Sequence, residues 1–193
     1  MFVTALHSPY ALITGPTGLV ACASYLAVAL VVRKIVTTII GYRVYPAASM
    51  TSETVKETEK SQISQLEAEG FILRKILLYK SSIRFDSVRI TDPNTIDNSD
   101  WTINALGNGM CVEDSIARLA KENFANTCNT LLVNGPSVCQ SGGWPTRYQM
   151  GAAFEAGICF LEQEVKATHI IMRGFSLGAG MMGEAILNHD FTQ

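Results

Sequence analysis

The sequence predicts an α/β domain with a mostly parallel sheet and flanking helices, preceded by one N-terminal transmembrane helix. Three observations support this fold class. Residues 10–32 carry no formal charge, short apolar runs alternate with helical periodicity from residue 71 onward, and a Gly-x-Ser-x-Gly motif follows the last apolar run. Alternating strands and helices favour parallel strands, because each crossover helix returns the chain to the same end of the sheet.

The composition excludes some classes of function. Charged residues make up 17% of the 193 residues, which is below the ~25% of an average soluble domain and typical of a chain with a membrane segment. The formal net charge of -2 shows no basic excess, so we expect no nucleic-acid partner.

The five cysteines form no Cys-x-x-Cys pair, and none has a histidine at ligand spacing. We therefore predict neither a metal site nor a cofactor, and we assign the cysteines to the core as reduced thiols. They are Cys22, Cys111, Cys128, Cys139 and Cys159.

Residues 1–46 predict a membrane anchor. As a helix, the uncharged stretch 10–32 would reach roughly 34 Å, and a bilayer core is about 30 Å thick, so we expect the lipid bilayer to be its partner. The basic residues Arg33, Lys34 and Arg43 follow this stretch instead of preceding it, which favours an uncleaved single-pass anchor with the C-terminal domain in the cytoplasm. The alternative is a buried helix of a soluble domain.

Residues 47–70 are rich in Ser, Thr, Glu, Lys and Gln. Val55, Ile63 and Leu66 form a thin apolar stripe at helical spacing, and Thr54-x-x-Glu57 resembles a capping box. We expect a helical, solvated linker between the membrane and the following domain.

Residues 71–193 predict the α/β domain. The runs 71–79 and 83–90 meet at a short polar junction, which indicates an antiparallel hairpin. Further strands are expected at 101–106, at 129–134 and around Ile170, with helices between them and after the last one. The loop 137–145 is either part of a pocket at the carboxyl ends of the strands or an ordinary connection.

The motif Gly174-Phe175-Ser176-Leu177-Gly178 stands between a predicted strand and a predicted helix. This order is typical of a nucleophile elbow, in which a sharp turn presents a serine. Gly174 and Gly178 leave room beside the strained serine, and the helix after the turn directs its N-terminal N–H groups toward a developing oxyanion. The alternative is a chance match in a glycine-rich turn.

From residue 71 onward this pattern resembles the N-terminal half of an α/β-hydrolase domain. The resemblance implies that Ser176 is the nucleophile. It also implies that the backbone N–H groups of Leu177 and of Asn108 or Gly109 are the oxyanion donors. Leu106 stands where many α/β-hydrolases have a histidine.

Two longer motifs resemble the uncharacterised chlamydial CHLPS membrane proteins. These are Trp-x-x-x-x-Leu-Gly-Asn-Gly-Met-Cys-x-Glu, beginning at Trp101, and Arg-Gly-Phe-Ser-Leu-Gly-Ala-Gly, beginning at Arg173. The resemblance implies a membrane protein with a hydrolase-like domain, and it supplies no substrate.

A catalytic base is not evident in the sequence. His189 lies roughly 19 Å along a helix from Ser176, His169 lies roughly 23 Å back along a strand, and His7 precedes the membrane span. We therefore expect 71–193 to be a truncated hydrolase-like domain that lacks its catalytic acid and histidine, with an exposed edge on the strand before Ser176.

Three hypotheses result. The first is a membrane-anchored serine hydrolase lineage acting on an ester, thioester or peptide, in which this chain has little turnover of its own. The second is a non-catalytic, membrane-tethered interaction or scaffold protein. The third is a structural membrane protein that exposes its linker and domain to a host or bacterial partner.

Overall fold

The structure is a computed structural model that describes residues 16–92, 100–124 and 128–191. The chain divides into two units, Met1–Ile40 and Gly41–Gln193.

The first unit contains most of the helix α2, Pro16–Val44. Its segment Leu19–Gly41 has a mean hydropathy of 2.0 and is long and apolar enough to cross a membrane. The helix begins at a proline, which is well suited to a first helical turn, and it continues past Arg33 and Lys34 without a break. Part of the predicted span, residues 10–15, lies outside the described residues.

The segment predicted as a solvated linker is helical, and most of its residues are exposed, but it has a buried apolar stripe. After a short 3₁₀ turn, η1 (Pro46–Ser49), the helix α3 runs over Ser52–Ala68 and packs against other elements of the second unit, among them strand β1 (Ile72–Lys80). Leu66 is fully buried and Val55 is nearly so. The predicted helical, solvated linker is therefore also attached to the domain along one side, because even a thin apolar stripe is buried when neighbouring elements accept it.

The predicted hairpin is confirmed. Strands β1 (Ile72–Lys80) and β2 (Ile83–Thr91) pair antiparallel in a register that sets Lys80 opposite Ile83. The two residues between them, Ser81 and Ser82, have φ angles of 49° and 64°. A two-residue turn with both residues at positive φ matches the natural twist of paired strands.

The sheet is mixed, not mostly parallel as predicted. Its strand order is β1-β2-β4-β3-β5, where β3 is Asp100–Ala105, β4 is Asn129–Val133 and β5 is His169–Gly174. The β3 strand pairs parallel with β4 and β5, whereas β2 pairs antiparallel with both β1 and β4. The short hairpin turn reverses the chain, so one strand of the hairpin must oppose the others.

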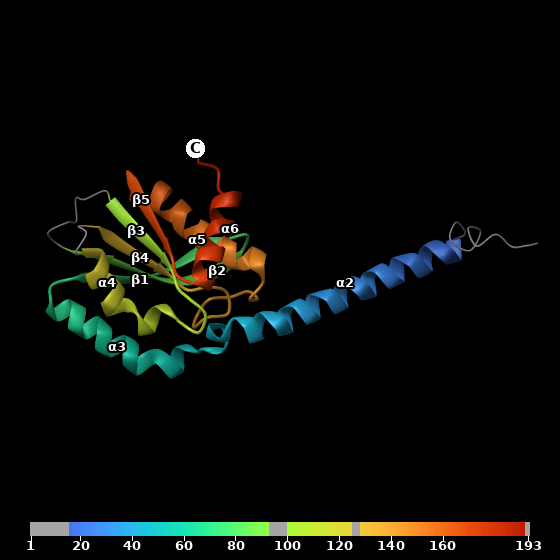
Figure 1. The fold of residues 1–193 in the computed structure, drawn as a ribbon, viewed down its shortest axis with the longest axis horizontal. Helices are drawn as coiled ribbons and strands as arrows, with labels where there is room; N and C mark the ends of the chain where they lie inside the picture. The colour runs from blue at the N-terminus through green and yellow to red at the C-terminus, as the bar shows by residue number, and fades with distance from the viewer. Residues whose placement is uncertain (1–15, 93–99, 125–127, 192–193) are drawn as a thin grey trace, which may run out of the picture. The chain divides into compact units, whose positions relative to one another are not determined.

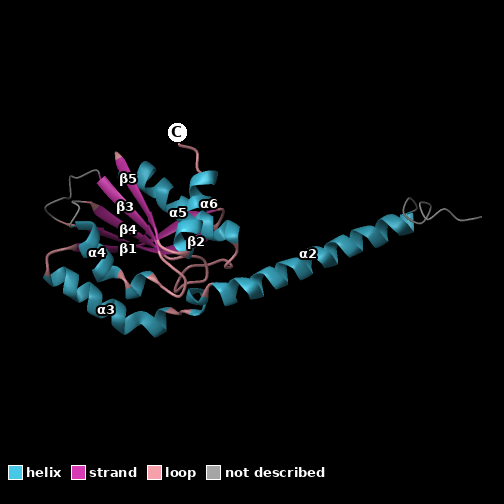
Figure 2. Cartoon of the chain, in the orientation of Figure 1, coloured by secondary structure: helices cyan, strands magenta, loops and turns pink. Residues whose placement is uncertain are grey.

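Helices cover both faces of the sheet (Figures 1 and 2). The helices α5 (Arg147–Phe160) and α6 (Leu177–Asn188) cover one face, and a π-helical turn, η4 (Leu161–Val165), extends α5. The helices α3 and α4 (Ile116–Phe124) cover the other face, with a 3₁₀ turn, η3 (Val112–Asp114), before α4. Two buried clusters result, one around Phe154 and Ile158 and the other around Leu66 and Ile116.

The sheet ends at β5 within the described part of the chain. This strand precedes Ser176 and pairs only with β3 there, and Ile171 on it is exposed. The arrangement agrees with the expectation of an open apolar edge beside the elbow.

The docking of α3 can be tested with Leu66→Ala in the full chain in detergent. Removing a fully buried leucine side chain should lower the free energy of unfolding by about 2–5 kcal/mol, measured by urea denaturation. The matched control is Ser64→Ala on the exposed face of the same helix, which should change it by no more than about 0.5 kcal/mol. If Leu66→Ala and Ser64→Ala both change the free energy of unfolding by no more than about 0.5 kcal/mol, α3 is not packed against the domain through Leu66.

Candidate active site

Ser176 occupies a strained backbone position between β5 and α6. Its φ of 54° and ψ of -121° lie outside the regions that L-residues ordinarily adopt. Such a conformation costs about 1–3 kcal/mol and persists only where the surroundings impose it. The turn is held by two hydrogen bonds, from the Gly178 N–H to the Phe175 carbonyl at 2.9 Å and from the Ala179 N–H to the Ser176 carbonyl at 3.0 Å.

The two glycines of the motif are required by close approach of backbone atoms. A Cβ on Gly174 would lie 2.5 Å from the Ala179 Cα. A Cβ on Gly178 would collide with the carbonyl oxygens of Ala105 and Leu106. The first turn of α6 therefore lies directly against the end of β3, and a side chain at either glycine would push the turn away.

The loop 106–110 lies beside the same turn. A Cβ on Gly107 would come within 2.9 Å of the Phe175 ring, and the Phe175 N–H donates to the Ala105 carbonyl at 3.1 Å. Asn108 is exposed and Gly109 has a φ of 76°. The fold thus brings the loop and the elbow together. That the N–H groups of Asn108, Gly109 and Leu177 form an oxyanion hole stays a prediction.

The described histidines are engaged away from Ser176. His169 is at the opposite end of β5, where its Nδ1 lies 2.8 Å from the Asp100 carboxylate. At the end of α6, His189 has its Nε2 2.9 Å from Glu162 Oε2 and its Nδ1 3.9 Å from the Cys159 sulfur. In the described part of the chain neither imidazole bonds to the serine. His7 lies outside the described residues.

A pocket of about 470 Å³ opens beside the elbow. Gly174 and Phe175 line it on one side, and Leu106 and Met110 contribute apolar surface from the loop after β3. Two groups on its wall are already paired, because Arg173 donates to Asn123 Oδ1 at 2.8 Å and Arg118 lies 3.0 Å from Glu122. The pocket is a concave apolar site with polar groups at its margin, as small-molecule sites commonly are.

The loop 137–145 does not line this pocket. It is held instead against the beginning of β2. The Gly142 N–H donates to the Arg84 carbonyl at 2.9 Å, and Ser141 Oγ accepts from the Asp86 N–H at 2.9 Å. Of the two interpretations of this loop, the structure therefore favours the ordinary connection over the pocket wall beside Ser176.

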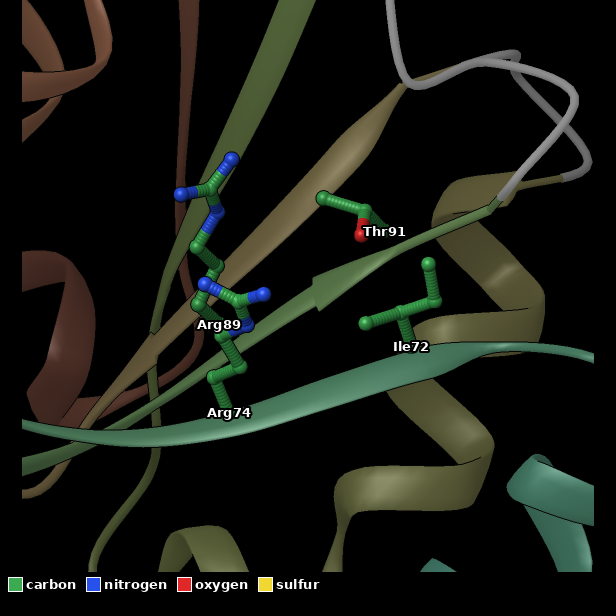
Figure 3. Close-up of a pocket in the computed structure, with 4 residues that line it drawn as sticks. All are labelled: Ile72, Arg74, Arg89 and Thr91. Carbon is green, nitrogen blue, oxygen red and sulfur yellow. The ribbon is translucent and has the colours of Figure 1, made fainter.

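A second pocket lies on the hairpin and is lined by Ile72, Arg74, Arg89 and Thr91 (Figure 3). Arg74 and Arg89 are direct cross-strand partners, and Arg89 stacks on Trp101 with 5.1 Å between its Cζ and the ring centre. Burial, and then the charge of Arg74, lower the pKa of Arg89. Because β4 and β3 separate the hairpin from β5, this pocket does not belong to the surroundings of Ser176.

The fold is that of α/β-hydrolases. An α/β-hydrolase from Vibrio vulnificus aligns with 76% of this chain at a TM-score of 0.57 and 15% identity, and the alignment covers 50% of that chain. An α-β serine hydrolase homologue from Coxiella burnetii aligns with 62% of this chain at a TM-score of 0.51 and 19% identity, and the alignment covers 58% of that homologue. The Pyrococcus furiosus esterase Pf2001 aligns with 60% of this chain at a TM-score of 0.51 and 17% identity, and the alignment covers 46% of the esterase. The chain therefore spans about half the length of these structures.

The family is shown by the sequence itself. Residues 20–193 match the Chlamydia CHLPS protein family (DUF818), so the chain belongs to that family. No curated protein matches the sequence significantly.

The close approach at Gly178 can be tested by Gly178→Ala. The added methyl group would meet two carbonyl oxygens, so we expect the free energy of unfolding of the full chain to fall by about 1–3 kcal/mol. Gly180→Ala on the same helix is the matched control, because its Cβ would enter open space and should stabilise the chain by about 0.4–1 kcal/mol. Urea denaturation of both variants compares them, and a stabilised Gly178→Ala would contradict the packing.

Proposed function

We propose that this chain is a membrane-anchored serine-hydrolase-like protein with Ser176 in the nucleophile position. The observation that carries the proposal is the strained backbone of Ser176, with its φ of 54°, held between a parallel strand and a helix N-terminus. A strained, exposed serine in this setting is the arrangement that acyl-transfer enzymes use. The substrate class of the lineage would be an ester, a thioester or a peptide.

We further propose that this chain alone has little turnover. A serine hydroxyl needs an adjacent base to become a strong nucleophile. Both described histidines are paired with carboxylates at sites remote from the elbow, at 2.8 Å and 2.9 Å. The activity of the whole protein would then depend on a base and an acid outside the described residues.

The second candidate function is a non-catalytic, membrane-tethered scaffold. It is favoured by Leu106, which is buried at the position where many α/β-hydrolases carry a polar histidine. In this interpretation Gly174 and Gly178 only allow the chain to form the turn, and Ser176 has no chemical role.

A fluorophosphonate probe on the full chain in detergent separates these two functions. We expect Ser176 to be labelled about 10⁶-fold more slowly than the serine of a hydrolase with a complete triad, because the turn is present without a base. Labelling should be measured over long incubation beside Ser176→Ala, with Ser137→Ala as a matched control, since Ser137 is a positive-φ serine in another loop.

Two results would contradict the proposal. Labelling as fast as that of a complete hydrolase would show a working base and overturn the claim of low turnover. Identical labelling of the wild type and Ser176→Ala would remove the serine-hydrolase interpretation and favour the scaffold.

We also propose that α2 anchors the chain in the lipid bilayer, with the C-terminal domain in the cytoplasm. The support is the 23-residue apolar segment Leu19–Gly41. The basic residues Arg33, Lys34 and Arg43 in the second half of this helix favour the cytoplasmic side for the C-terminal domain.

Alkaline carbonate extraction of membranes tests the anchor. We expect the full chain to stay with the membrane pellet and a Val28→Lys/Leu30→Lys variant to be released in larger part, because each lysine costs about 3 kcal/mol at the centre of a spanning helix. Release of the wild type would argue against a span. Protease digestion of intact spheroplasts tests sidedness, and cleavage of the domain from the outside would contradict a cytoplasmic position.

A further inference from the structure

The loops after β3 and β4 bring two thiols and a carboxylate together. Cys111 and Glu113 come from the first loop and Cys139 from the second. One potential ligand atom from each of these residues, the two sulfurs and a carboxylate oxygen, lies within 4.8 Å of the other two. Zinc sites place thiolates and carboxylates about 2–2.3 Å from one ion, which sets two tetrahedral ligand atoms roughly 3.5–3.8 Å apart. Side-chain movements of about 1 Å would bring the three atoms to this spacing.

The cluster is buried and its carboxylate is oriented. Cys111 is fully buried, Glu113 nearly so, and Cys139 partly. The Asn134 side-chain amide donates to both Glu113 oxygens, at 3.1 and 2.9 Å, and its own oxygen accepts from the Val112 N–H at 2.9 Å. Hydrogen bonds of this kind to a ligand carboxylate are typical of the outer shell of metal sites.

A second observation shows that negative charge here is not fully compensated. Asp86 is 2% exposed, and its Oδ2 accepts no hydrogen bond in the described part of the chain. The Lys75 ammonium lies 3.9 Å from both Asp86 and Glu113, but it lies 2.6 Å from Glu59. One lysine therefore faces three carboxylates.

We propose that Cys111, Glu113 and Cys139 bind one thiophilic divalent cation, with zinc as the first expectation. Two thiolates select against magnesium and calcium, which prefer oxygen ligands alone. Three protein ligands leave one tetrahedral position for water. The Lys75 ammonium, 3.9 Å from Glu113 Oε1, is the charged group that lies beside this ligand carboxylate.

Binding requires the two thiols to lose their protons. The Cys111 thiol donates to Asp114 Oδ2 at 3.3 Å, and Asp114 is exposed, so this bond can be given up to solvent. The Cys139 thiol must lose its proton as well, because the thiolate is the form of cysteine that binds a metal ion. A divalent cation replaces both protons, which pass to solvent, and leaves two metal–thiolate bonds.

The ion would join the loop after β3 to the loop after β4. This role is independent of Ser176, since neither cysteine lines the pocket beside the elbow. The site also revises the expectation that the sequence contains no metal ligands. That expectation rested on Cys-x-x-Cys spacing, whereas these ligands come from two loops separated by a helix and a strand.

The test measures zinc and cobalt on the full chain in detergent under reducing conditions. After reconstitution with zinc sulfate and removal of the excess, we expect about one zinc per chain by elemental analysis. Cobalt(II) in place of zinc should produce a thiolate-to-metal charge-transfer absorption. Cys111→Ser/Cys139→Ser should lose the zinc and the absorption band, and Asn134→Ala should bind about 10–100-fold more weakly.

Cys22→Ser/Cys159→Ser is the matched control and should keep both signals, because neither residue belongs to the cluster. Absence of zinc and of the cobalt band in the wild-type chain would overturn the proposal without reference to any variant. Equal zinc in the two double variants would also overturn it, as would a Cys111–Cys139 disulfide found by mass spectrometry of the chain kept under reducing conditions.

Discussion

The close approach of the first turn of α6 to the end of β3 is the constraint on which the rest of the domain depends. It exists because Gly178 has no side chain to meet the Ala105 and Leu106 carbonyls. This contact leads to the strained conformation of Ser176, the position of Phe175 against Gly107, and the pocket between β3, β5 and α4. The absence of a side chain at Gly178 therefore sets how closely α6 packs against β3.

The opposite side of the sheet is organised by a different constraint, the two-residue turn at Ser81 and Ser82. It makes the hairpin antiparallel, and the hairpin then places β2 beside β4. The β1–β2 side also carries an ion-pair network, in which the exposed Lys75 from β1 lies 2.6 Å from Glu59 of α3. Helix α3 is therefore part of the domain through both its apolar stripe and this ion pair.

The two candidate sites use the carboxyl ends of the strands differently. The elbow depends on backbone geometry, and its serine has no imidazole partner in the described residues. The Cys111–Glu113–Cys139 cluster depends on side chains that converge from two loops. Sheets of this type place ligands at the carboxyl ends of their parallel strands, because several loops meet there. A cation between two of these loops would stiffen the end of the sheet that also presents Ser176.

Features that rest on short-range patterns can be predicted from the amino-acid sequence alone. The apolar run before Arg33 predicts a helix long enough to span a bilayer, and the glycines around Ser176 predict a strand, a turn and a helix in that order. The mixed strand directions, the burial of Leu66 and the proximity of Cys111 to Cys139 become evident only in the folded structure. The physical reason is that periodicity records which side of an element is apolar, whereas the partner of that side is set by contacts between residues far apart in the chain.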